Sequence, residues 1–224
     1  MMLAALMCLG LALLVRTPWL QGIDGQVTHE VQEHPNAAFD LLFETLTFLG
    51  NTATLVTVAA IAAALLVVRK LPRAAVFSVL SLLALPLDVA IKDVVERARP
   101  NSDIVRVLTP VSGYSFPSGH SMGSAAVYGM LAYLTFVHLR RAKRAVSVSF
   151  GVLPFAIALS RIYVGAHWMS DVLAGLSAGA FVVLALVHLY SLPGRAEDTH
   201  EDQPLDGTLT GNVPPPSAHR QAGA

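Results

Sequence analysis

Three short blocks of the sequence carry the residue types that phosphate chemistry needs. The blocks are Lys92 with Arg99-Pro100, then Pro117-Ser118-Gly119-His120, then Ser160-Arg161 followed by His167 and Asp171. Cations held at fixed positions suit a phosphate dianion, because an arginine fork or a lysine point charge pairs with its oxygens. The two histidines suit a reaction with one nucleophile and one proton donor. The blocks therefore predict a site for phosphoryl chemistry.

The last block contains a candidate nucleophile. His167 and Asp171 are four positions apart, so on a helix they would share one face. A carboxylate there can keep one ring nitrogen of His167 protonated and leave the other free to attack. The alternative is an interfacial ion pair. His120 falls in the first turn of the next expected helix, where it could give a proton to a departing oxygen; the alternative is an interfacial histidine behind a helix cap.

The remaining residues of the blocks are predicted to bind phosphate. Ser118 is a good N-cap, and Gly119 would let an anion approach the free amides of a helix start, although it could instead serve close helix packing. Lys92, Arg99 and Arg161 would supply the positive charge.

Asp88 lies one helical turn before Lys92 inside an apolar run. A carboxylate at that depth usually has a partner, so we expect Asp88 to orient the lysine rather than to act in catalysis. Alternatively, Lys92 snorkels at a membrane edge and Arg99 joins a solvated cluster. The other members of that cluster would be Glu96, Arg97 and Arg106.

The composition is that of a polytopic membrane protein. Of 224 residues, 54% are hydrophobic and only 13% are charged, and the formal net charge of zero gives no sign of a nucleic-acid partner. Apolar runs at 1–20, 52–68, 74–91, 120–139, 145–162 and 172–190 each approach the length of a bilayer-spanning helix. We therefore predict an all-α bundle of six transmembrane helices over residues 1–190. The polar, proline-containing segment 191–224 is predicted to be a disordered cytoplasmic tail.

The charges between the apolar runs predict an orientation. The connections at 69–73 and 140–144 are basic, whereas the long connection 17–51 is mainly acidic. Basic loops stay in the cytoplasm, so both termini should be cytoplasmic and the three blocks should face the periplasm or the exterior. Apolar residues recur at helical spacing after Ala37. They indicate a short amphipathic helix that either lies on the membrane surface or packs against the bundle.

Taken together, the blocks resemble the signature of the type 2 phosphatidic acid phosphatase family of lipid phosphate phosphatases, in its membrane-bound branch. The chain matches every specified residue and spacing of that signature, and the resemblance spans roughly residues 41–189. It implies that His167 is a nucleophile forming a phosphohistidine, that Asp171 holds it, and that His120 protonates the leaving group. Lys92, Arg99, Arg161, Ser118 and the backbone at Gly119 would cradle the phosphoryl oxygens.

The resemblance further implies a lipid phosphate as substrate and activity without a metal or other cofactor. Phosphatidic acid, phosphatidylglycerol phosphate and a polyprenyl pyrophosphate such as undecaprenyl pyrophosphate all remain possible substrates, and the sequence does not indicate an oligomeric state. A phosphotransferase using the same histidine is the nearest alternative. Vanadium-dependent haloperoxidases share the signature but are soluble. Two further alternatives are not enzymes. A transporter would carry charged groups throughout its spans, whereas here most of them cluster at one set of helix ends. A catalytically silent scaffold should have lost a residue of the signature, and none is lost.

Overall fold

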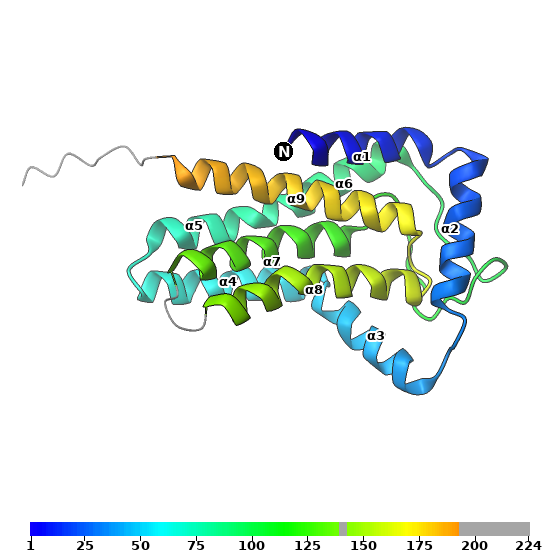
Figure 1. Ribbon diagram of the computed structural model, residues 1–224, viewed down its shortest axis with the longest axis horizontal. Helices are drawn as coiled ribbons and strands as arrows, with labels where there is room; N and C mark the ends of the chain where they lie inside the picture. The colour runs from blue at the N-terminus through cyan, green and yellow to red at the C-terminus, as the bar shows by residue number, and fades with distance from the viewer. Residues whose placement is uncertain (139–142, 193–224) are drawn as a thin grey trace, which may run out of the picture. The chain divides into compact units, whose positions relative to one another are not determined.

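The computed structural model describes residues 1–138 and 143–192, so most of the predicted tail at 191–224 lies outside the described residues. Every regular element in these ranges is helical, which confirms the all-α fold class. The helices, drawn in Figure 1, are α1 (Met2–Leu14), α2 (Pro18–Val31), α3 (Ala37–Leu49), α4 (Thr52–Val68), α5 (Pro72–Leu80), α6 (Ala84–Val95), α7 (Gly119–His138), α8 (Lys143–Tyr163) and α9 (Met169–Ser191). A single 3₁₀ turn, η1 (Ser81–Leu83), joins α5 to α6.

Helix α7 lies at the centre of the bundle and packs mainly against α8 and α9. Its core-facing side chains, among them Met122 and Met130, are fully buried. Glycines on α9 let the two backbones approach closely: a Cβ at Gly179 would lie 2.5 Å from the carbonyl oxygen of Met122. Small residues at such contacts are typical of helices that pack inside a membrane.

The six predicted membrane spans are not exactly confirmed by the lengths and compositions of the helices. Three stretches of the described residues, 72–95, 144–163 and 169–191, are long and apolar enough to cross a membrane. Counting each of two bent helix pairs as one span raises the number to at most five. Helix α7 is 20 residues long, but its mean hydropathy is too low for it to count among these candidate spans. It is surrounded by other helices, so serines and glycines face protein rather than lipid.

The connection 17–51 contains two helices where the sequence predicted one. Thr17 caps α2 and Pro18 starts it, and α2 runs at 103° to α1, across one end of the bundle (Figure 1). The predicted helix after Ala37 is α3, and it packs against α8. The Phe43 ring stacks on that of Tyr163, with ring centroids 4.2 Å apart. The helix therefore packs against the bundle, and the alternative that it lies on the membrane surface stays a prediction.

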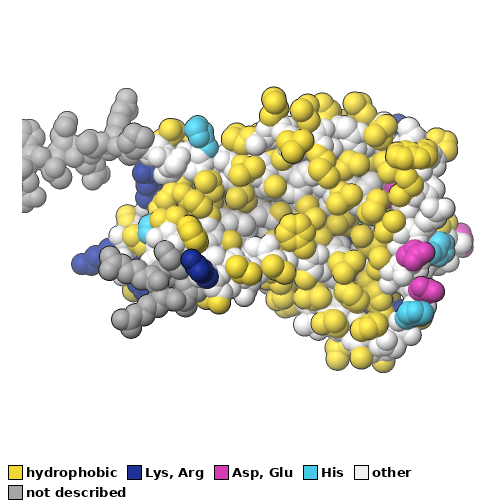
Figure 2. Space-filling view, viewed as in Figure 1, with side chains coloured by type: hydrophobic (Ala, Val, Ile, Leu, Met, Phe, Trp, Pro, Cys, Tyr) yellow, Lys and Arg dark blue, Asp and Glu magenta, His cyan; other side chains and the backbone are white. Residues whose placement is uncertain are grey.

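Charged side chains gather at the two ends of the bundle. Figure 2 shows lysine and arginine mainly at the end where α4 joins α5, and acidic side chains at the opposite end, where α2 lies. The surface between them is largely hydrophobic. This distribution is expected of a protein whose middle contacts lipid tails and whose ends contact water.

Candidate active site

The three sequence blocks meet in one pocket near the α2 end of the bundle. The pocket has a volume of about 620 Å³. Six of the predicted site residues line it: Lys92, Arg99, Gly119, His120, Arg161 and His167. Further walls come from Thr47 on α3, from Asn51 before α4, and from apolar side chains of α6. The predicted residues, separated by up to 75 positions in the sequence, therefore share one cavity.

His167 lies in the short loop between α8 and α9 and is almost completely buried. Its Nε2 is 3.0 Å from Nη1 of Arg99. A guanidinium can only donate, so Nε2 accepts and the proton of the neutral ring belongs on Nδ1. Burial lowers the pKa of His167 to about 4, against the opposing effect of Asp171. The ring is therefore neutral near pH 7, with an unprotonated nitrogen in the pocket.

The contact between His167 and Asp171 is less direct than predicted. Nδ1 of His167 lies 3.7 Å from Oδ2 of Asp171, which is too long for a hydrogen bond. The Ser115 hydroxyl bridges the two groups, donating to Oδ2 of Asp171 and lying 3.4 Å from Nδ1. Ser115 was not singled out from the sequence, although it stands two residues before Pro117.

Behind the histidine, the carboxylate of Asp171 is fully buried and firmly held. It accepts hydrogen bonds from the backbone N–H of Trp168 and from the guanidinium of Arg97. The Arg97 guanidinium also pairs with Asp24 on α2, at 2.6 Å. The sequence alternative that placed Arg97 in a solvated cluster is wrong, because two buried carboxylates surround it. Only the fold brings Asp24 to this position.

Lys92 points into the site rather than toward a membrane edge. Its Nζ is 2.6 Å from Oδ1 of Asp88 and 2.6 Å from the carbonyl oxygen of Pro117. The predicted orienting role of Asp88 agrees with this geometry. Gly119 makes room for that carboxylate, because a Cβ there would lie 2.6 Å from Oδ2 of Asp88. Gly119 thus leaves room for a negatively charged group, which in this structure is the carboxylate of Asp88.

Arg99 and Arg161 carry positive charge without a carboxylate partner among the described residues. Arg99 donates to the carbonyl oxygens of Gly113 and Ala166. Arg161 is 2% exposed, donates from Nη1 to the Thr47 hydroxyl, and has no hydrogen-bond partner for its buried Nε within residues 1–138 and 143–192. A buried cation without a counter-ion is costly. The pocket is therefore suited to bind an anion.

The charge of the pocket lining matches a phosphomonoester. Three cations and one carboxylate line the pocket, which leaves two positive charges when both histidines are neutral. A phosphomonoester dianion carries two negative charges and several strong acceptor oxygens.

His120 lines the same pocket from the first turn of α7. Its Nε2 lies 2.8 Å from Oδ1 of Asn51, an acceptor, so Nε2 carries a proton. Asn51 was not singled out from the sequence. Ser118 is fully buried, its hydroxyl accepts from that of Ser121, and it is absent from the pocket lining. Its contact with phosphate therefore stays a prediction.

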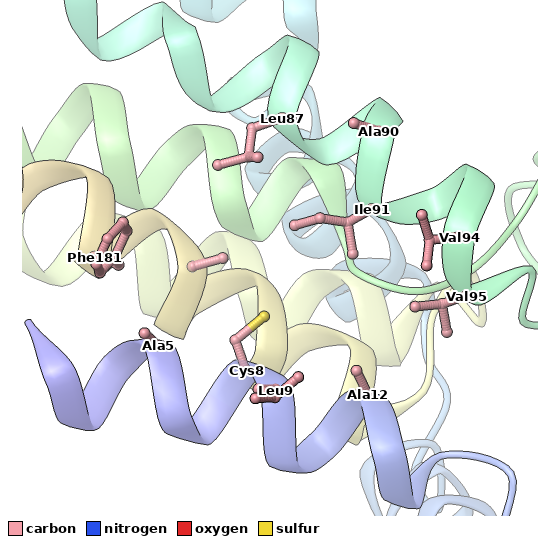
Figure 3. A pocket seen from close by; sticks show the side chains of 11 residues that line it. Ala5, Cys8, Leu9, Ala12, Leu87, Ala90, Ile91, Val94, Val95 and Phe181 are labelled. Carbon is pink, nitrogen blue, oxygen red and sulfur yellow. The ribbon is translucent and has the colours of Figure 1, made fainter.

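A second cavity lies elsewhere in the bundle and has different chemistry. The groove between α1, α6 and α9 has a volume of about 500 Å³ and is lined by apolar side chains and Cys8 (Figure 3). None of the predicted site residues lines it. The candidate active site is therefore the pocket around His167.

Comparison with known proteins finds sequence relatives of this chain. Residues 73–195, more than half of the chain, match the sequence model of the PAP2 superfamily. Phosphatidylglycerophosphatase B of Bacillus subtilis is 40% identical over 96 residues, which cover 42% of this chain and 46% of that protein. Lipid A 1-phosphatase of Rhizobium etli is 38% identical over 90 residues, which cover 38% of this chain and 35% of that protein. The match thus spans less than half the length of each relative.

Solved structures extend the similarity to most of the chain. The crystal structure of the first transmembrane PAP2 type phosphatidylglycerolphosphate phosphatase from Bacillus subtilis superposes with a TM-score of 0.79 and 27% identity. That match covers 86% of this chain and 96% of the other. LpxE of Aquifex aeolicus has the same fold, with a TM-score of 0.59 at 18% identity over 73% of this chain and 93% of the other.

Proposed function

Because this chain belongs to the PAP2 superfamily, we propose that it is an integral-membrane lipid phosphatase acting through a phosphohistidine at His167. One observation carries the proposal: an unprotonated Nε2 of His167 faces a pocket that also contains two guanidiniums without carboxylate partners among the described residues. Such a pocket can hold a phosphoryl group and attack it. The superfamily match and the phosphatases among the similar proteins support the same reaction.

The proposed first step transfers the phosphoryl group to His167. Nε2 attacks the phosphorus, the N–P bond forms, and the bond to the leaving oxygen breaks with its electron pair. The bound dianion favours the imidazolium form of His120, which gives its proton to the leaving oxygen. Lys92, Arg99 and Arg161 stabilise the charge on the other phosphoryl oxygens.

The second step releases phosphate. His120, now neutral, takes a proton from a water molecule as the water oxygen attacks the phosphorus. The N–P bond breaks and its electron pair returns to Nε2 of His167. Both histidines end as they began, so the cycle consumes only water. If an acceptor alcohol replaced this water, the enzyme would be a phosphotransferase, and product analysis would reveal the phosphorylated alcohol.

The substrate is proposed to be a lipid with a terminal phosphate. Leu85, Pro86 and Val89 of α6 form an apolar wall beside the phosphate-binding residues. An acyl or prenyl chain can therefore leave the pocket toward the lipid. Among the candidates, phosphatidylglycerol phosphate and phosphatidic acid carry a dianion that matches the two net positive charges of the free pocket, whereas a pyrophosphate is offset only when the charge of protonated His120 is added.

In the membrane, we place the pocket on the periplasmic or exterior side and both termini in the cytoplasm. The basic residues of 69–73, and Arg144 near the start of α8, support this orientation because they lie at the opposite end of the bundle from α2. Accessibility of single introduced cysteines to a membrane-impermeant reagent in intact cells would test it.

A phosphate-release panel in detergent tests the function. Purified protein should release phosphate from phosphatidylglycerol phosphate and phosphatidic acid faster than from undecaprenyl pyrophosphate, and much faster than from a soluble phosphomonoester. No three His, Cys, Asp or Glu side chains in the described part of the chain are placed to hold a metal ion, so we expect full turnover in excess EDTA. Phosphate release that stops in EDTA and returns with Mg²⁺ would contradict metal independence, and no release from any lipid would contradict the function.

A further inference from the structure

Asp24 is a buried carboxylate that the proposed reaction does not use. It lies on α2, outside the three blocks and outside the matched superfamily segment, and it is fully buried. Its Oδ1 accepts from the backbone N–H of Ser170 at 2.8 Å. Its Oδ2 accepts from the Ser170 hydroxyl and from Nη2 of Arg97, each at 2.6 Å. A buried carboxylate is retained only with such partners.

Arg97 links Asp24 to the catalytic side of the pocket. While Nη2 donates to Asp24, Nη1 donates to Oδ1 of Asp171 and to the Ser170 hydroxyl. One guanidinium thus lies between two carboxylates, all of them buried. The three groups together carry a single negative charge, and Asp171 presents it to His167 through Ser115.

That net charge matters because the reaction makes His167 cationic. When Nε2 bonds to phosphorus, a ring that keeps its proton on Nδ1 gains a positive charge. Arg97 alone would neutralise Asp171 and leave no net charge behind the ring to stabilise it. In a buried site this difference is large, because little solvent screens it. Asp24 offsets Arg97 and so preserves the negative charge of Asp171.

We propose that Asp24 is a positioning residue for catalysis that acts through Arg97, holding Asp171 in place and keeping one net negative charge behind His167. The proposal rests on the function proposed above. It assigns a catalytic purpose to α2, which the three blocks do not include. The simpler role for Asp24 is to fasten α2 to the start of α9 through Ser170. Both roles predict that Asp24 matters, so the test must separate charge from fastening.

Three variants separate the two roles. Asp24→Asn keeps the shape but removes the charge, leaving Arg97 to neutralise Asp171. The double variant Asp24→Asn with Arg97→Gln removes both opposite charges and restores the single charge of Asp171. Thr28→Val is the matched control, because Thr28 is equally buried one turn further along α2 and its hydroxyl donates only to the Asp24 carbonyl oxygen.

The readouts are kcat, KM and the thermal unfolding midpoint on the best lipid of the panel. We expect Asp24→Asn to lower kcat about ten- to fiftyfold with little change in KM, because the lost charge acts on the transition state. The double variant should recover a large part of that kcat even if its unfolding midpoint is lower, and Thr28→Val should match the wild type.

Two outcomes would overturn the proposal: an unchanged kcat in Asp24→Asn, or a double variant no more active per folded molecule than Asp24→Asn. If Asp24→Asn does not fold, the double variant alone tests the proposal. The charge role predicts that the double variant folds and is active. The fastening role predicts that it loses at least as much folded protein and activity as Asp24→Asn. A wild type that releases no phosphate from any lipid would instead overturn the proposed function itself.

Discussion

Replacing His167 by alanine is expected to lower kcat by about 10⁴-fold or more while the protein still folds and inserts into the membrane. The ring provides the atom that attacks the substrate in the proposed first step, and its loss removes the covalent intermediate. Phosphate release from the best lipid of the panel, in detergent, measures the effect. His188→Ala is the matched control, because this exposed histidine near the end of α9 lies outside the pocket and its loss should leave kcat unchanged.

Residual activity in His167→Ala would be informative. If the variant kept more than about one hundredth of the wild-type kcat, water rather than His167 would be the main nucleophile. The geometry argues against that result, because Nε2 of His167 directly faces the Arg99 guanidinium that would bind the phosphoryl group.

Replacing Arg161 by methionine should have two opposite effects. Activity should fall about 10²- to 10³-fold, because a cation that stabilises the phosphoryl oxygens is removed. The free protein should become more stable, because Arg161 is buried, lacks a carboxylate partner among the described residues and has an unsatisfied Nε. Lower activity with higher stability is expected of a binding residue whose unpaired charge destabilises the free protein and is compensated only by bound substrate.

Thermal unfolding with and without inorganic phosphate tests this directly. Phosphate should raise the unfolding midpoint of the wild type but not of Arg161→Met. Arg106→Met provides the contrast, because Arg106 is paired with Asp40 at 2.6 Å, so its replacement should not raise stability. An Arg161→Met protein that is less stable than wild type and still active would show that Arg161 is a structural residue.

Local sequence spacing is enough to predict one contact of the candidate site. Asp88 and Lys92 are four positions apart on one helix, and their predicted pairing follows from helix geometry alone. The meeting of the three blocks in one pocket also agrees with the structure, since each block ends or begins an apolar helix near the same end of the bundle.

Other site contacts depend on tertiary structure. Arg97 and Asp24 are 73 positions apart, and His120 and Asn51 are 69 apart. No periodicity connects such pairs, and an arginine beside an acidic residue in a polar loop is typical of a solvated surface. Ser115 likewise reaches Asp171 across 56 positions. The first contact requires α2 to cross the end of the bundle, and the other two require the loops before α4 and α7 to fold onto the site.

The six-span count is not fully confirmed, for a related physical reason. Apolar runs predict lipid-facing helices best, because the lipid requires hydrophobic side chains around most of the helix. α7 is enclosed by other helices and carries buried serines and glycines, so its composition resembles that of a packed core helix. α1 ends at Leu14, earlier than its apolar run, because Thr17 and Pro18 start α2.

The most direct test of the central claim is to trap the phosphorylated enzyme. Protein turning over a lipid labelled with ³²P in its terminal phosphate is quenched in denaturant and digested, and the labelled peptide is identified. The mechanism predicts an acid-labile, alkali-stable label on the peptide that contains His167, absent from His167→Ala. Label on another residue, or rapid turnover with no labelled enzyme at any quench time, would contradict a phosphohistidine at His167.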